Sequence, residues 1–249
     1  MSELADRRST FMIVMGCNGC GKTAWKRANY DRLPERYFDQ DSIAGGIGDW
    51  NSESVRARTR EFVDAEIAKC FSERVSFGSE STFSGRPGPA LLDRAVAGGY
   101  RVEGYYIGTE SWEINARRIK RRVLANTGHD VDPAELPQRY RWSLSNLRKH
   151  LGKFDVVEVV DNSVDELMVV HGREDEPATG SDGRWADGIP DPQVQFVAEK
   201  GEITMKAPPQ ELAAWAAAQL RRLELARQQA AALVERKSGR QDCGRGRTD

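Results

Sequence analysis

A glycine-rich segment near the start of the chain has the residues of a phosphate-binding loop. Residues 16–23 read GCNGCGKT, in which two glycines five positions apart precede Lys22 and Thr23. Glycines let backbone N–H groups curl around an anionic phosphate, Lys22 would reach the terminal phosphates, and the Thr23 hydroxyl would ligate Mg²⁺. The segment therefore predicts binding of a nucleoside triphosphate, ATP or GTP. The predicted nucleotide-binding residues are Gly16, Cys17, Asn18, Gly19, Cys20, Gly21, Lys22 and Thr23.

Two of the four cysteines lie in this loop and allow a second interpretation. The spacing Cys17-x-x-Cys20 also occurs in redox and zinc sites. Zinc takes about four ligands, and Cys70 and Cys243 stand alone, so we expect the loop cysteines to be small, exposed residues that could react with oxidants. The three histidines have no ligand-like spacing, and we predict no metal other than magnesium.

An aspartate next to a second short strand could act as a general base. Residues 37–43, YFDQDSI, are predicted to form a strand that presents Asp41 at its carboxyl end. Ligands of open α/β sheets bind at that end, so Asp41 is a candidate to accept the proton of a substrate hydroxyl during phosphoryl transfer. The alternative is that Asp41 caps the next helix. Residues 45–48 are predicted to form a flexible loop.

A hydroxyl-rich segment follows the next predicted strand, at residues 74–80. Residues 79–86 read SESTFSGR and precede the turn predicted at residues 87–89. Charged and hydroxyl side chains at the end of a strand favour contacts with substrate over a purely structural loop.

A basic helix is predicted at residues 111–125. Its residues 117–122, RRIKRR, carry five cations, and Arg118 shares one side with Arg122. These cations are either a solvated face or part of a lid that brings guanidinium groups to the transferred phosphate. A Gly/Pro-containing joint at residues 127–133 and a helix at residues 134–151 follow, as a lid would require, and both interpretations stay open.

The elements that must position these residues alternate between strand and helix, which predicts an α/β fold with a mostly parallel sheet. Further strands are predicted at residues 10–15, 100–107 and 154–160, the last closing the sheet. Further helices are predicted at residues 24–30, 52–72, with an apolar stripe of Val55, Phe62, Ile67 and Phe71, and 90–97. Beyond residue 163 we predict a strand at 165–171, a surface loop at 172–192 with Trp185 against the core, a hairpin at 194–205 and a long helix from 208 to about 237.

Composition limits the classes of protein that fit. The chain has 249 residues, 39% hydrophobic and 30% charged, and a net charge of −1. The balanced charge disfavours nucleic acid as a partner. No apolar run has the length of a membrane span, and the first residues lack a signal peptide, so we expect a cytoplasmic protein. We expect a kinase core at residues 1–163, with a lid at about 111–151, an extension at 164–237 that covers the sheet or binds a second copy, and a disordered tail at 238–249.

Taken together, these motifs resemble the zeta-toxin-like P-loop kinases over about residues 10–163. The resemblance rests on the order and spacing of GCNGCGKT, FDQDSI, SESTFSGR, GYRVEGYYI, the basic helix, GHDVDP, RYRWSLSNL and DNS. It implies a P-loop NTPase three-layer sandwich with a helical lid, and a possible antitoxin partner. It also implies transfer of phosphate from ATP or GTP to a small hydroxylated acceptor, such as the 3′-hydroxyl of UDP-N-acetylglucosamine.

The resemblance also assigns roles to individual residues. It implies that Asp41 is the general base beside the catalytic Lys22, that Glu80 and Thr82 hold the acceptor and that Arg86 follows them in the substrate site. The arginines that would stabilise the transferred phosphate are Arg118, Arg122 and Arg139. Arg86 stands two residues later than the family's substrate arginine, which predicts a different acceptor. The alternatives are a polynucleotide or nucleoside kinase and a non-catalytic, nucleotide-gated binding protein.

Overall fold

The structure is a computed structural model that describes residues 8–49, 52–125, 131–163, 193–199, 202–207, 212–222 and 224–225. The strand predicted at residues 165–171, the loop at 172–192, the tail and most of the long helix lie outside the described residues.

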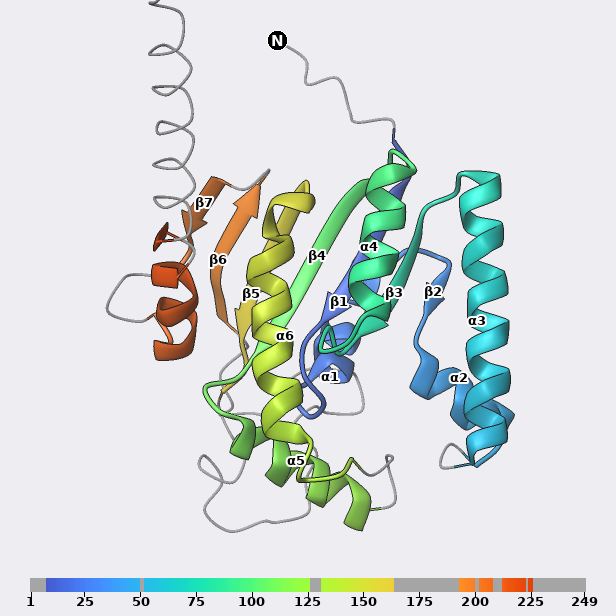
Figure 1. Ribbon diagram of the computed structural model, residues 1–249, viewed down its shortest axis with the longest axis horizontal. Coiled ribbons are helices and arrows are strands. Elements are labelled where there is room, and N and C mark those ends of the chain that lie inside the picture. The colour runs from blue at the N-terminus through green and yellow to red at the C-terminus, as the bar shows by residue number, and fades with distance from the viewer. Residues whose placement is uncertain are drawn as a thin grey trace, which may run out of the picture.

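A seven-stranded sheet forms the centre of the molecule in the order β2-β3-β1-β4-β5-β6-β7 (Figure 1). Strands β1 to β5 are parallel to one another, and β6 and β7 add to β5 as an antiparallel hairpin. The strands are β1 Thr10–Met15, β2 Tyr37–Phe38, β3 Phe77–Ser81, β4 Arg101–Gly108, β5 Val156–Asp161, β6 Gln193–Glu199 and β7 Glu202–Met205. The mostly parallel α/β sheet and the hairpin are confirmed, but β5 does not close the sheet, because β6 pairs along its outer edge.

Helices lie on both faces of this sheet, which gives the three layers of the predicted sandwich. In Figure 1, α4 and α6 lie in front of the strands and α1 lies behind them. The helices are α1 Lys22–Ala28, α2 Gln40–Ile47, α3 Glu53–Glu73, α4 Pro87–Ala97, α5 Trp112–Leu124 and α6 Leu136–His150, with short 3₁₀ helices η1 Tyr30–Arg32 and η2 Leu151–Lys153. Residues 214–222 are also helical.

The segment predicted as a second strand at residues 37–43 is mostly helix. Strand β2 stops at Phe38, because the Asp39 side chain accepts hydrogen bonds from the backbone N–H groups of Asp41 and Ser42 and so starts α2. Asp41 itself lies in the first turn of α2, and Asp39 rather than Asp41 is the cap. The glycines predicted as a loop at residues 45–48 mostly belong to the same helix, which ends at Ile47.

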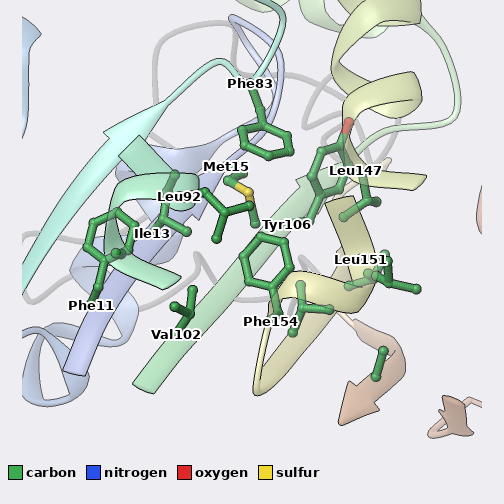
Figure 2. Close-up of a cluster of buried hydrophobic side chains, with 14 of the residues drawn as sticks. Phe11, Ile13, Met15, Phe83, Leu92, Val102, Tyr106, Leu147, Leu151 and Phe154 are labelled. Carbon is green, nitrogen blue, oxygen red and sulfur yellow. The ribbon is translucent and has the colours of Figure 1, made fainter. Parts of the chain in front are cut away.

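Successive apolar side chains of β1 point to opposite faces of the sheet and so contribute to the core on both faces. Phe11, Ile13 and Met15 face α3, α4 and α6, while Met12 and Val14 face the other side, together with Trp25 of α1. Figure 2 shows the first group packed with side chains of β4, α4 and α6. Two apolar layers thus hold β1 and the loop that follows it.

Helix α3 agrees with the prediction in extent but not in every buried residue. Its buried side chains are Thr59, Val63, Ile67 and Cys70. Phe62, which was predicted in the apolar stripe, is 50% exposed. The buried positions recur every three or four residues, so the stripe passes through Val63 and leaves its neighbour on the outside.

The residues predicted as a turn at 87–89 form the first turn of α4, where proline is tolerated because that N–H needs no partner inside the helix. Before this helix, Phe83 has a φ of 53° and is fully buried. Its backbone N–H donates to Ser81 Oγ at 3.0 Å, and Asn146 Nδ2 of α6 donates to its carbonyl at 2.9 Å. Figure 2 shows the Phe83 ring pointing into the core beside Met15. Phe83 therefore anchors the hydroxyl-rich loop.

Trp215 packs against Gly108, the last residue of the central strand β4. A Cβ on Gly108 would lie 2.2 Å from the indole, and Trp215 Nε1 donates to Asp161 Oδ1 at 2.6 Å. Ala216 and Leu220 are buried with it. The described part of the predicted long helix therefore covers the chain's own sheet. Within the described ranges, no helix is both long and apolar enough to cross a membrane.

Phe83→Ala should lower the free energy of unfolding by about 3–5 kcal/mol, because it empties a fully buried aromatic site. Phe62→Ala is the matched control and should change it by less than about 1 kcal/mol, because Phe62 is half exposed. Urea unfolding of both variants measures the difference. Equal losses in the two variants would contradict the burial described for Phe83.

Candidate functional site

The predicted phosphate-binding loop connects β1 to α1. Gly21 has a φ of 100°, and a Cβ there would lie 2.1 Å from Asn162 Nδ2. Asn162 uses that same nitrogen to donate to the Cys20 carbonyl at 2.8 Å. Gly19 has a φ of 78°, and a Cβ on it would lie 2.5 Å from the Asn115 carbonyl of α5. Left-handed backbone and close packing thus require glycine at both positions.

Lys22 points back along its own loop. Its Nζ donates to the Gly16 carbonyl at 2.8 Å and to the Cys17 carbonyl at 3.4 Å, and lies 3.7 Å from Glu80 Oε1. Burial alone would lower the pKa of the Lys22 ammonium, but neighbouring acidic groups, Cys20 and Glu80 foremost, raise it above its ordinary value. The loop therefore presents a fixed positive charge.

A second buried lysine, Lys26, joins two carboxylates one turn further along α1. Lys26 Nζ forms an ion pair with Asp39 Oδ2 and lies 2.5 Å from Glu80 Oε2. Burial would raise the pKa of Asp39, but the Lys26 charge and its hydrogen bond outweigh burial and hold that pKa below its usual range. Asp39 in turn caps the helix that carries Asp41. Lys26 thus fixes the ends of β2 and β3 relative to the phosphate-binding loop.

These elements enclose a pocket of about 560 Å³. Five of the residues predicted from sequence line it together: Asn18, Lys22, Asp41, Glu80 and Thr82. Thr82 Oγ1 and Ser84 Oγ are 2.9 Å apart, and the Thr82 carbonyl accepts a hydrogen bond from Ser143 of α6 at 2.8 Å. The candidate base and the loop lysine therefore face one cavity.

None of the predicted arginines is among the lining residues of this pocket. Arg86 is exposed before α4. Arg118 and Arg122 belong to α5, and Arg118 Nη1 would lie 4.0 Å from a Cβ on Gly21, beside the end of the loop. Arg139 of α6 donates to Asn18 Oδ1 at 3.5 Å and pairs with Glu135 at 2.6 Å. Thr23 is exposed in the first turn of α1.

The two loop cysteines are not exposed, contrary to the expectation from sequence. Cys17 is 2% and Cys20 1% exposed. Burial, together with the charge of Cys20, raises the pKa of Cys17 to about 11. Burial also raises the pKa of Cys20. Both thiols therefore pack as small apolar groups and stay protonated near neutral pH.

Sequence reasoning assigned no role to Lys26, Asp39 or Asn162, although each fixes part of the site. Lys26 follows Lys22 by four residues and so lies on the same side of α1, a spacing that could have signalled it. Asp39 stands at a strand end ahead of a helix, where a capping residue is common. The contact of Asn162 with Cys20 joins residues 142 positions apart in the chain, and no local pattern predicts it.

Comparisons with known proteins identify one relative by sequence and solved structures with a similar fold. No protein-family model matches the chain. An uncharacterized protein of Haemophilus influenzae is 31% identical over 131 residues, which are 53% of this chain and 91% of that protein. The solved structure of AvrRxo1-ORF1:-ORF2 with ATP matches 80% of this chain at 10% identity with a TM-score of 0.53, and the chain spans 61% of that protein. A PezAT toxin-antitoxin structure from Streptococcus pneumoniae matches 63% of this chain and 70% of that chain, at 17% identity with a TM-score of 0.48.

Lys26→Met should destabilise the protein by about 3–5 kcal/mol near neutral pH, because it leaves the partly buried Asp39 carboxylate without its cation and Glu80 with only the more distant Lys22. The pKa of Asp39 is lowered in the folded protein, so its ion pair stabilises at neutral pH and is lost as the pH falls through that pKa. The difference from the wild type should therefore stay constant from about pH 7 down to about pH 4 and shrink as the pH falls further.

Urea unfolding at several pH values measures this dependence. Lys69→Met is the control, because Lys69 pairs with Glu66 on the exposed surface of α3, and it should leave the unfolding free energy unchanged at every pH. A Lys26→Met loss that does not depend on pH would contradict the assignment of the ion pair.

Cys17 should react with iodoacetamide at about pH 7.5 at least about a hundredfold more slowly than glutathione, because only a trace of thiolate exists at its raised pKa. Cys20 should behave in the same way. Peptide mass spectrometry over a time course gives the rate at each cysteine. Rates like that of glutathione would show that the loop thiols are accessible and ionised.

Proposed function

This chain belongs to the same family as the uncharacterized Haemophilus influenzae protein. We propose a function for it from the geometry of the site. The chain is a kinase that transfers the γ-phosphate of ATP or GTP to a hydroxyl of a small molecule. The observation that carries this proposal is that Lys22 and Asp41 line the same pocket.

The donor half of the site is the phosphate-binding loop. The loop supplies backbone N–H groups at the start of α1 and a buried, protonated Lys22, which together favour the β- and γ-phosphates. Lys22 would exchange its contacts with Gly16 and Cys17 for the phosphate oxygens. The exposed Thr23 hydroxyl fits Mg²⁺, which accepts oxygen ligands. Among the described residues, no group of three or more His, Cys, Asp or Glu side chains is placed to hold a metal ion. Phosphate oxygens and water are ligands that Mg²⁺ commonly takes beside one protein oxygen.

The acceptor half centres on Asp41. In the proposed step the acceptor hydroxyl oxygen bonds to the γ-phosphorus, and its proton moves to the Asp41 carboxylate. The bond between the γ-phosphorus and the bridging oxygen breaks, and the nucleoside diphosphate leaves. The ion pair of Lys26 with Asp39 holds α2 and so holds Asp41 in place, which is the positioning that phosphoryl transfer needs.

Cations on the lid side would balance the charge on the transferred phosphate. We assign this role to Arg118 and Arg122 of α5 and Arg139 of α6, and we propose that residues 111–151 move as the lid. Arg118 lies beside Gly21, and Arg139 contacts Asn18, so both already border the loop. Guanidinium groups at such positions stabilise developing charge.

The acceptor site is proposed to include Glu80 and Thr82, which line the pocket. Arg86 would join them only after a change in its loop, because it is exposed outside the lining. A UDP-sugar such as UDP-N-acetylglucosamine is the acceptor that the resemblance implies and the first to test. An antitoxin is a proposed partner. Self-association through the C-terminal helix would have to use residues other than Trp215 and Leu220, which the sheet already covers.

Asp41→Asn should lower phosphate transfer from labelled ATP to UDP-N-acetylglucosamine or to the small molecules of a cell extract by at least about a hundredfold. The affinity for ATP should stay within about twofold, because Asp41 accepts a proton and holds no donor phosphate. Labelled product on chromatography gives the rate, and calorimetry gives the Kd for ATP.

Asp31→Asn is the matched control, because Asp31 is an exposed aspartate of η1 outside the pocket lining, and it should transfer phosphate at the wild-type rate. Full turnover in Asp41→Asn would remove Asp41 from the mechanism.

A further inference from the structure

One side of α6 carries four polar side chains beside the apolar residues that bury the helix. Arg139, Ser143, Asn146 and His150 follow one another at intervals of three or four residues, so they share one side of the helix. Ser143 is fully buried and His150 is 6% exposed, and Leu147 between them belongs to the core. Buried polar groups are costly unless they make hydrogen bonds. The partners of these side chains therefore show what the stripe holds.

Ser143 connects the centre of the sheet to the hydroxyl-rich loop. Its hydroxyl donates to the Thr82 carbonyl at 2.8 Å and lies 3.1 Å from the Tyr106 hydroxyl of β4. A serine hydroxyl has one proton, so Tyr106 is the donor in the second contact. Burial raises the pKa of Tyr106 well above its ordinary value, and the phenol keeps the proton that it donates. The two hydrogen bonds together fix the backbone of Thr82 relative to β4.

Asn146 holds the same loop on both sides of Ser84. Its Nδ2 donates to the Phe83 carbonyl at 2.9 Å and to the Gly85 carbonyl at 3.5 Å. The His150 ring packs edge-on against Phe83, with the ring centroids 6.0 Å apart. The backbone of Phe83 is left-handed, with a φ of 53°, a conformation that persists where the surroundings enforce it. The contacts from α6 therefore determine the shape of this loop.

The loop that α6 holds presents two hydroxyl groups to the pocket. Thr82 and Ser84 both line the pocket, and their side-chain oxygens are 2.9 Å apart. We call these two groups the hydroxyl pair. The same stripe of α6 also contacts the phosphate-binding loop, where Arg139 donates to Asn18 Oδ1 at 3.5 Å. One helix thus touches the loops of both halves of the proposed site.

We infer that the hydroxyl pair binds the acceptor and that Ser143 and Asn146 are the positioning residues that hold the pair in place. The inference rests on the proposed phosphotransfer and adds Ser84 to its acceptor site. Two adjacent hydroxyls donate and accept hydrogen bonds at once, which suits a hydroxylated acceptor. Ser143 and Asn146 are not among the lining residues, so they act through the loop. Movement of α6 in the proposed lid would carry the hydroxyl pair with it.

The small-molecule fraction of a bacterial cell extract, incubated with the full chain, saturating labelled ATP and Mg²⁺, tests this inference. The extract concentration at half the maximal rate reports acceptor affinity. Asn146→Asp keeps the size of the side chain and removes its donor, so it should raise that concentration at least about fivefold and leave the Kd for ATP within about twofold. Ser143→Ala and Ser84→Ala should act in the same direction. Ser145→Asp and Ser145→Ala are the matched controls, because Ser145 is exposed on the same helix, and they should change neither quantity.

A chain with both Asn146→Asp and Ser84→Ala tests whether Asn146 acts through the hydroxyl pair. Its half-saturating concentration should exceed that of Ser84→Ala by less than about twofold, because effects that pass through one contact do not add. A merely structural role would lower the maximal rate through the folded fraction and leave the half-saturating concentration unchanged.

That result in Asn146→Asp would overturn the inference while upholding a kinase, as would an unchanged half-saturating concentration in Ser84→Ala or a fully additive rise in the double variant. Ser84→Ala removes one loop hydroxyl outside the core, so it decides the question even where Asn146→Asp does not fold. No labelled product from the wild type would overturn both proposals.

Discussion

The ion pairs of Lys26 are the interaction on which the site depends most. A lysine buried in α1 is costly unless its charge is compensated, and here Asp39 and Glu80 compensate it from the ends of β2 and β3. The same contacts therefore tie α1 to the ends of β2 and β3 at the carboxyl edge of the sheet. Because Asp39 also caps α2, the position of Asp41 depends on the charge of Lys26.

The charged groups of the site come from separate parts of the chain. The sheet brings Lys22 and the carboxylates at the strand ends to one edge. The positive charge of Lys26 is compensated within the fold by Asp39 and Glu80. Additional cations come from α5 and α6, which are separate in sequence from the acid-bearing helices α2 and α3.

Patterns within short segments of the sequence predicted several elements of the fold. The loop of residues 16–23, the strand before it and α3 follow from glycine spacing and hydrophobic periodicity. The extent of β2 could not be predicted, because an aspartate suits both a strand end and a helix cap, and the hydrogen bonds of Asp39 decide between them. The apolar stripe of α3 was placed on Phe62 because several helix faces carried large side chains. Partners such as Asn162 are fixed by strand order, which a single sequence does not contain.

Trp215 connects the helix at residues 214–222 to the phosphate-binding loop through Asp161 and Asn162. Its indole donates to Asp161, and the next residue, Asn162, holds the Cys20 carbonyl. A shift of the helix at residues 214–222 would break the first of these contacts at the residue next to Asn162. The position of the Cys20 carbonyl thus depends on the packing of a helix that contributes no residue to the loop.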